Sequence, residues 1–66
     1  MRLTVNGEPR DLPADCSVAM LVALFTPAVR GVAVAVNSEV VPRSTWDTAS
    51  LADGDRVEVL TAAQGG

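Results

Sequence analysis

Val32-Ala33-Val34-Ala35-Val36 is the stretch that decides the fold, because it is the clearest strand signal in the chain. A β-branched residue stands at every second position, with a small residue between each pair, which is typical of a strand in a packed sheet. Side chains alternate across a strand. We therefore expect the three valines to face a helix, with Ala33 and Ala35 on the opposite face of the sheet.

A short helix is predicted before this strand. Its apolar positions recur at helical spacing and are Val18, Leu21, Val22 and Phe25. Ser17 precedes them and can act as the N-cap, because its hydroxyl can accept a hydrogen bond from a free amide of the first turn. Pro27 follows, and the residue before a proline avoids helical angles, so we expect the helix to end at about Thr26.

Two strands are predicted at the start of the chain. Arg2-Leu3-Thr4-Val5 alternates polar and apolar residues, as a half-buried strand does. Asn6-Gly7 then favours a type I′ hairpin turn, which needs positive φ at both central residues. Residues 8–12 would return as the second strand. Pro9 places that strand at an edge of the sheet, because proline donates no ladder hydrogen bond.

A hairpin is also predicted after the valine-rich strand. Asn37-Ser38 favours a tight turn into a brief strand, Glu39-Val40-Val41, which Pro42 ends. Ser44, with the acidic Asp47 three residues later, predicts a short turn that begins with a capping serine.

The last strand, residues 56–60, follows the turn sequence Asp53-Gly54-Asp55. The element order is therefore strand, strand, helix, strand, strand, strand. This order predicts an α+β fold, in which a mixed sheet of about five strands has one main helix packed on one face. We expect the first and last strands to be adjacent and parallel, which is the β-grasp, or ubiquitin-like, arrangement. Residues 1–60 would form this domain, and residues 61–66 a flexible C-terminal tail.

The composition argues against several classes of function. The 66 residues include one cysteine, no histidine and no lysine, and the formal net charge is −3. A chain this short has little room for an enclosed active site. Its scattered acidic residues predict no metal site, and no basic cluster favours nucleic acid or a membrane surface. Without lysine, it is not expected to be linked into chains of itself.

The same features predict a cytoplasmic protein, and nothing in the sequence requires more than a monomer. The longest apolar run, residues 18–25, is too short to span a bilayer. Met1 leads almost directly into a strand pattern, which leaves no room for a signal peptide. A lone cysteine permits no internal disulfide, so a reducing compartment fits best.

Gly65-Gly66 ends the sequence, after a short polar stretch. Glycine lacks a Cβ, so backbone here could pass a channel too narrow for a side chain. At 3.3–3.6 Å per residue, residues 61–66 would reach roughly 20 Å when extended. The reactive group at this end is the α-carboxylate of Gly66, which is ionised at neutral pH. We therefore expect other proteins to act on Gly66.

Residues 34–46 carry a signature that extends to the end of the chain. Its parts are Ala35-Val36-Asn37, Val41-Pro42-Arg43, Trp46, Asp53-Gly54-Asp55 and Gly65-Gly66. Together they resemble the ThiS family, the sulfur carriers of the thiamine pathway, and the resemblance covers the whole chain. Two features depart from the family pattern: Gln64 stands before the diglycine where many members have a small residue, and the helix lacks the usual acidic residues.

The resemblance implies a carrier rather than an enzyme. An E1-like adenylyltransferase would use ATP to adenylate the carboxylate of Gly66, and sulfur would displace AMP to leave a thiocarboxylate. That sulfur would come indirectly from a cysteine desulfurase or a rhodanese-type donor. Thiazole synthase would then receive it. The chain itself would bind no cofactor and no metal, while Gly65 and Gln64 would give the partners access to Gly66.

The sheet face away from the helix is the candidate docking surface. It would present Ala33, Ala35 and Leu60, and Arg43 could contact an acidic partner surface. A shallow apolar strip with a polar rim suits a modest, transient interface. The alternative is an ordinary exposed sheet face, since apolar atoms are common on protein surfaces.

Three other kinds of residue invite functional roles, and we assign them structural ones. Cys16 precedes a helix and could carry sulfur, but no histidine or lysine is present to activate its thiol. Trp46 could anchor a partner, but a single tryptophan in so small a domain more often closes the edge of the core. Asp53 and Asp55 flank Gly54 as turn formers rather than as catalytic carboxylates.

Three other functions are alternatives. The small subunit of molybdopterin synthase has the same fold and chemistry, but its chains are usually longer and fit the signature less well. A ubiquitin-like modifier would instead be joined to lysines of other proteins. A binding module with an idle tail would not need Gly65-Gly66 at all.

Overall fold

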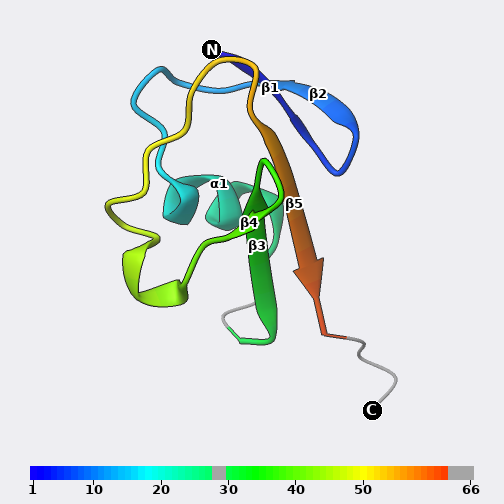
Figure 1. Ribbon diagram of the computed structural model, residues 1–66, viewed down its shortest axis with the longest axis vertical. Helices are drawn as coiled ribbons and strands as arrows, with labels where there is room; N and C mark the ends of the chain where they lie inside the picture. Colours follow the sequence, from blue (N-terminus) through cyan, green and yellow to red (C-terminus); the bar gives the residue numbers. More distant parts are fainter. Residues whose placement is uncertain (28–29, 63–66) are drawn as a thin grey trace.

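A five-stranded mixed sheet forms the frame of the protein in the computed structural model, which describes residues 1–27 and 30–62. The elements in chain order are β1 (Arg2–Val5), β2 (Glu8–Asp11), α1 (Val18–Phe25), β3 (Val32–Val36), β4 (Glu39–Val40), a 3-10 helix (Arg43–Thr45) and β5 (Arg56–Thr61). The strand order across the sheet is β2-β1-β5-β3-β4 (Figure 1). β1 and β5 run parallel, whereas the other neighbouring pairs are antiparallel. The predicted β-grasp arrangement is confirmed.

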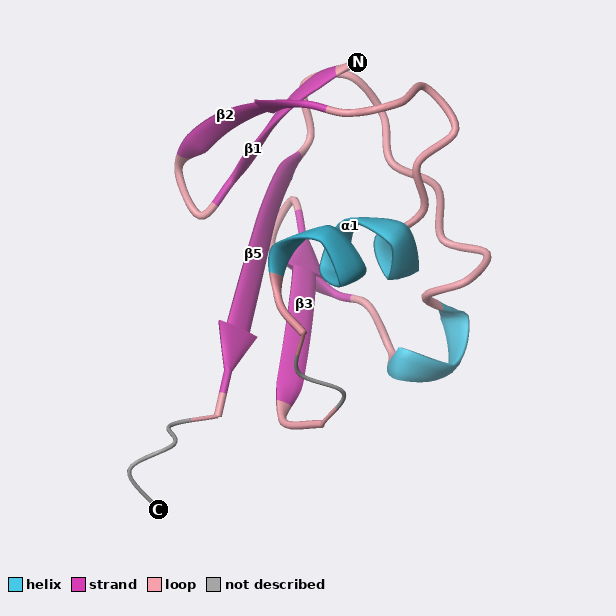
Figure 2. Cartoon of the chain, turned by 180° about the vertical axis from the view of Figure 1, so that it is seen from behind, coloured by secondary structure: helices cyan, strands magenta, loops and turns pink. Residues whose placement is uncertain are grey.

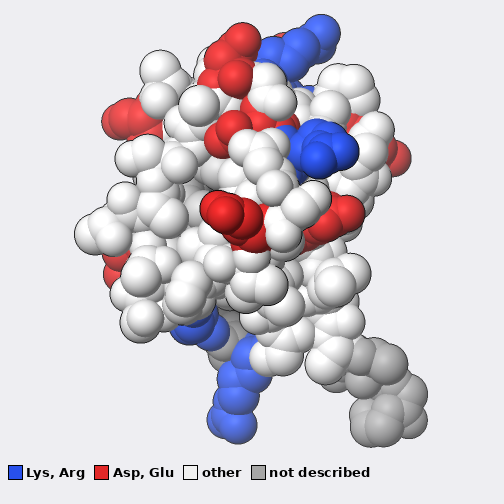
Figure 3. Space-filling model, in the orientation of Figure 1, with Lys and Arg blue, Asp and Glu red and all other residues white. Residues whose placement is uncertain are grey.

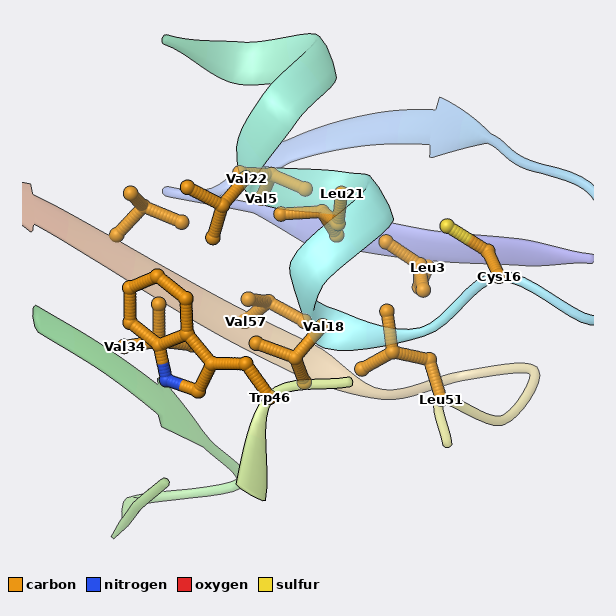
Figure 4. Packing of buried hydrophobic residues seen from close by; sticks show 11 residues of the cluster. Leu3, Val5, Cys16, Val18, Leu21, Val22, Val34, Trp46, Leu51 and Val57 are labelled. Atoms are coloured by element: carbon orange, nitrogen blue, oxygen red, sulfur yellow. The ribbon is translucent and has the colours of Figure 1, made fainter. Parts of the chain in front are cut away.

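Helix α1 crosses one face of the sheet, over β5 and β3 (Figure 2). Its N-cap and end are as predicted: the Ser17 hydroxyl accepts from the Met20 amide, and the helix is capped at Thr26. The core lies between helix and sheet, with Trp46 and Leu51 closing one side (Figure 4). Its buried members are Leu3, Val5, Cys16, Val18, Leu21, Val22, Val34, Trp46, Leu51, Val57 and Val59.

Both predicted tight turns are present, and both use positive φ angles, which the sequence predicted for Asn6-Gly7. Asn6 and Gly7 have φ of 52° and 82°, and Asn37 and Ser38 have φ of 51° and 72°. Asparagine tolerates this left-handed region, and glycine occupies it freely. Pro9 lies in β2, which is an edge strand as expected.

The alternation predicted for β3 is also confirmed. Val34 is buried, and Val32 and Val36 pack against the core, while Ala33 is exposed on the other face. No element among the described residues covers that other face, which is turned towards the viewer in Figure 1. It is called the open face below.

Three local predictions need correction. Phe25 is 38% exposed rather than part of the buried helix face, because it lies towards the edge strand β2, where Arg10 is over its ring. Ser44 does not cap the short turn: the 3-10 helix begins one residue earlier, after Pro42, and the Thr45 hydroxyl donates to the Pro42 carbonyl. β4 ends at Val40 rather than at residue 41.

Candidate functional site

Strand β5 is the element that leads to the C-terminal residues, and it lies in the centre of the sheet. Its side chains alternate: Val57 and Val59 are buried under α1, while Arg56, Glu58 and Leu60 are exposed. The burial of the two valines fixes which face of the strand is turned outward, because a slip of one residue would reverse every side chain.

The side chain of Asn6 holds β5 on the side of β1. The β1–β5 pairing ends at Val5 and Val57, and the Asn6 amide donates to the Val57 carbonyl at 2.9 Å. Asn6 Oδ1 then accepts from the Val59 amide at 2.9 Å, and Nδ2 donates to the Val59 carbonyl at 3.1 Å. Because the side chain offers both an acceptor and a donor, it extends the ladder beyond the end of β1.

Asn37 holds the start of β5 on the side of β3. Its Oδ1 accepts from the Arg56 amide at 3.0 Å, and its own amide donates to the Arg56 carbonyl at 2.7 Å. Its Nδ2 donates to Asp55 Oδ1 at 3.0 Å, and Asp55 Oδ2 accepts from the Ala52 amide at 2.8 Å. Asp53 accepts from the Arg2 amide at 2.6 Å. Both aspartates are engaged in turns, as the sequence predicts.

The end of β5 extends beyond the predicted boundary at residue 60. Thr61 pairs with Val32, and the Ala62 amide donates to the Gly31 carbonyl at 2.6 Å. The first two residues assigned to the tail are therefore attached to the sheet. Gln64, Gly65 and Gly66 lie outside the described residues.

An apolar strip lies on the open face beside the end of β5. Ala33 is directly opposite Leu60 in the β3–β5 ladder, and Ala35 is opposite Val40 in the β3–β4 ladder. Leu60 and Val40 are 68% and 78% exposed. These four residues are called the open-face strip. Figure 3 shows an uncharged surface over the lower part of β3 and the end of β5, with acidic and basic groups above it and basic groups below it in that view.

Comparison with known proteins identifies the family. The model of the ThiS family matches residues 3–66. The chain belongs to the ThiS family. ThiS proteins are small sulfur carriers of thiamine biosynthesis, so the family predicted from the signature, its pathway and its carrier role are confirmed.

Solved structures of another ThiS protein have the same fold. The crystal structure of the thiamine biosynthesis protein ThiS from Geobacter metallireducens is 38% identical, and the alignment covers 100% of both chains with a TM-score of 0.83. A solution NMR structure of a thiamine biosynthesis protein from the same organism gives a TM-score of 0.82 at 38% identity, covering 100% of this chain and 88% of the other.

A longer relative carries the same region within a larger protein. A thiazole synthase from Paramagnetospirillum magneticum (strain ATCC 700264 / AMB-1) is 36% identical over all 66 residues. This ThiS-family chain spans only 20% of that relative's length.

The structure separates Arg43 from the other predicted docking residues. Ala33, Ala35 and Leu60 are brought together on the open face. Arg43 instead starts the 3-10 helix, and its guanidinium lies 4.7 Å from the centre of the Trp46 ring. That ring closes the edge of the core, as predicted for Trp46.

Val40 was missed as a member of the open-face strip. In a hairpin with a two-residue turn at Asn37-Ser38, Val36 pairs with Glu39 and Ala35 pairs with Val40. The predicted turn was therefore enough to place Val40 beside Ala35. Val40 is larger than either alanine and is 78% exposed, whereas Ala35 is half-buried. It therefore adds more apolar surface to the strip than they do.

Cys16 lacks the properties of a sulfur-transfer residue. Its side chain is 1% exposed, and its Sγ lies 3.5 Å from the Ser17 carbonyl. Burial raises the pKa of the Cys16 thiol, and the nearby charge of Asp15 raises it further. A reactive thiol needs the opposite shift, because the thiolate is the nucleophile.

Residues 1–27 and 30–62 contain no group of three or more His, Cys, Asp or Glu that could hold a metal ion. A shallow groove of about 230 Å³ lies between β2 and α1, lined by Val5, Arg10, Asp11, Leu12, Leu21, Leu24 and Phe25. Among these described residues, no helix is long and apolar enough to cross a membrane.

Proposed function

We propose that this ThiS-family sulfur carrier is loaded at the α-carboxylate of Gly66. A carboxylate is a poor electrophile, so it must first be activated. In the proposed sequence, a carboxylate oxygen attacks the α-phosphate of ATP on an E1-like adenylyltransferase and pyrophosphate leaves. A sulfur nucleophile at the sulfide level then attacks the acyl carbon and expels AMP. The product is a C-terminal thiocarboxylate.

The observation that carries this proposal is the way the fold leads to the chain end. The family match runs through Gly66, and the strand before it is the central one, held from both neighbours by Asn6 and Asn37. The only thiol of the chain is buried. In this proposal the folded domain presents Gly66, and the partners supply the nucleotide, the metal and the catalytic side chains.

Thiazole synthase is the proposed acceptor of the sulfur. The protein of that name from P. magneticum contains a region 36% identical to this whole chain, which supports a functional association between the two activities. A cysteine desulfurase or rhodanese-type protein would supply the sulfur indirectly, through the activating enzyme.

The open-face strip is the proposed docking surface for these partners. It is apolar, its two large members Leu60 and Val40 are exposed, and it lies beside the strand that leads to Gly66, so a bound partner would be close to the reacting end. The patch is small, and charged groups flank it on the same face. Such a surface suits an interface that forms and dissolves in each cycle.

Intact-mass spectrometry tests the proposal. The purified chain, its mass first checked to end at Gly66, is incubated with the activating enzyme, ATP and a sulfur source. We expect a gain equal to the mass of sulfur minus that of oxygen, localised to Gly66 by fragmentation, and loss of that gain when thiazole synthase and its substrates are added.

A variant lacking Gly65 and Gly66 is the matched control, and it should fold normally but gain no sulfur. Adducts on lysines of other proteins, without a thiocarboxylate, would indicate a modifier instead. Transfer of the sulfur to a molybdopterin precursor but not to thiazole synthase would place the carrier in the other pathway. An unchanged mass with competent partners would refute the proposal.

A further inference from the structure

The contact between Gly31 and Ala62 is unusually tight. The Ala62 amide donates to the Gly31 carbonyl at 2.6 Å, and Gly31 has φ of +69°. A Cβ built on Gly31 would lie 2.8 Å from the Ala62 Cβ, a distance that requires one of the two backbones to move. Gly7 and Gly54 also have positive φ, but a Cβ on either would meet nothing within 4 Å.

This contact comes where the other attachments of β5 have ended. The pairing with β1 stops at Val57, and the Asn6 side chain reaches Val59. From Leu60 onward, the described ladder is formed with β3 and the residue before it, through Ala33, Val32 and finally Gly31. Gly31–Ala62 is thus the last attachment that the structure describes before residue 63.

We propose that Gly31 is a positioning residue for the carrier end, an inference that rests on the proposed function. Gly31 holds Ala62 against the sheet, so that the distance Gly66 can reach is measured from a fixed Ala62. The maximum reach beyond Ala62 is the length of four residues, about 14 Å at 3.3–3.6 Å per residue. The roughly 20 Å expected from six residues is correspondingly shortened.

The shortened reach defines a geometric requirement for the partners. Each must bring its reacting group within about 14 Å of Ala62 while it contacts the domain. Holding Ala62 also limits the volume that Gly66 can sample. Correct placement of a reacting group is worth large rate factors, and small displacements are costly.

Gly31→Ala tests the proposal, with Gly54→Ala as the matched control. Both substitutions force an alanine into positive φ, at +69° and +88°, but only the first creates a Cβ contact. We expect both to lower the urea midpoint, and Gly31→Ala to lower it somewhat more because it also loses the Ala62 hydrogen bond. Only Gly31→Ala should lower kcat for thiocarboxylate formation, by about 3- to 10-fold, with KM for the carrier changed less than about twofold because the open-face strip is intact.

The double variant Gly31→Ala/Ala62→Gly provides the rescue. It removes the Ala62 Cβ that would collide, while the backbone strain at residue 31 remains. We expect kcat to return most of the way to that of the unaltered protein although the urea midpoint does not. A general loss of stability would instead lower kcat and the urea midpoint together in both variants.

Hydrogen exchange at the Ala62 amide gives a readout that needs no partner. In the unaltered protein this amide should be protected by its bond to Gly31, and Gly31→Ala should remove that protection while the Val59 amide keeps its own. Retained protection at Ala62, or a kcat for Gly31→Ala equal to that for Gly54→Ala, overturns the positioning role. Failure of the unaltered protein to gain sulfur overturns the proposed function instead.

Discussion

The first part of β5 and its last residues are held in different ways. Between Arg56 and Val59, the strand is bonded on both sides, and Val57 and Val59 are sealed beneath α1. From Leu60 to Ala62, the described bonds go to β3 and Gly31, and the side chains are exposed. The comparison teaches that one strand can be held in two ways: its first part is buried and bonded on both sides, and its last residues are exposed and bonded, as far as the structure describes them, towards β3.

The largest expected effect is on stability, from shortening a side chain in the first part of β5. Val57 is 1% exposed, so Val57→Ala removes two buried methyl groups and leaves a cavity, at a cost of about 2 kcal/mol. Leu60→Ala on the same strand should cost less than about 0.5 kcal/mol. Urea unfolding followed by circular dichroism measures both, and equal losses would show that the two parts of β5 do not differ.

A similar loss, also about 2 kcal/mol, is expected from Asn6→Gly. Glycine accepts the positive φ of this position, so the substitution isolates the two side-chain hydrogen bonds to Val59. Hydrogen exchange should show faster exchange at the Val59 amide. If Val59 exchange and the unfolding free energy are both unchanged, the Asn6 side chain does not hold the strand.

A smaller effect, on binding rather than on folding, is expected from Leu60→Asp. A carboxylate in the open-face strip should weaken the docking of the activating enzyme by about tenfold, or 1.4 kcal/mol. Leu24→Asp is the matched control, because Leu24 is 70% exposed on α1 and Leu60 is 68% exposed. Isothermal titration calorimetry against the enzyme would separate them, and equal weakening by both would argue against the open face as the docking surface.

The smallest effect concerns Cys16, which lies outside β5. Cys16→Ala should cost about 1 kcal/mol for lost burial and leave thiocarboxylate formation intact, as mass spectrometry would show. Loss of sulfur loading without loss of folding would make Cys16 part of the chemistry.

The thiol also predicts a pH dependence. The pKa of the Cys16 thiol is raised in the folded state above its ordinary value of 9.0. As the pH rises above 9.0, the unfolded state therefore loses this proton before the folded state does. The free energy of unfolding, which has its full value below pH 9.0, declines in that range. Cys16→Ala should remove this part of the alkaline decline. Identical alkaline profiles of the two proteins, measured by urea unfolding, would contradict the buried thiol.

Much of the fold was predictable because its signals are local. Asn6-Gly7 fixes a hairpin, Ser17 and Pro27 bound the helix, and the valines of β3 alternate as a sheet requires. Ala33 and Leu60 were placed on one face correctly, because alternation along two strands is enough to assign a face once the strands are known.

The remaining features depend on contacts between distant segments or on an exact start of a turn. Phe25 has the helical spacing of a core residue, but its burial depends on the neighbouring edge strand β2, which leaves it 38% exposed. The attachment of Ala62 depends on a carbonyl 31 residues away, at Gly31. Arg43 and Trp46 stack because side chains three residues apart eclipse in a 3-10 helix, and the sequence had placed the start of that turn one residue later.

The central place of β5 has a mechanical consequence. In the proposed function, a partner that draws Gly66 into its site would pull along the axis of β5, whereas the hydrogen bonds to β1 and β3 run across that axis. The pulling force is then distributed over many hydrogen bonds that are loaded in shear. These bonds would not break one after another, as they would if the strand were peeled from the sheet. If the proposed function holds, the carrier would therefore keep its fold while a partner pulls on Gly66.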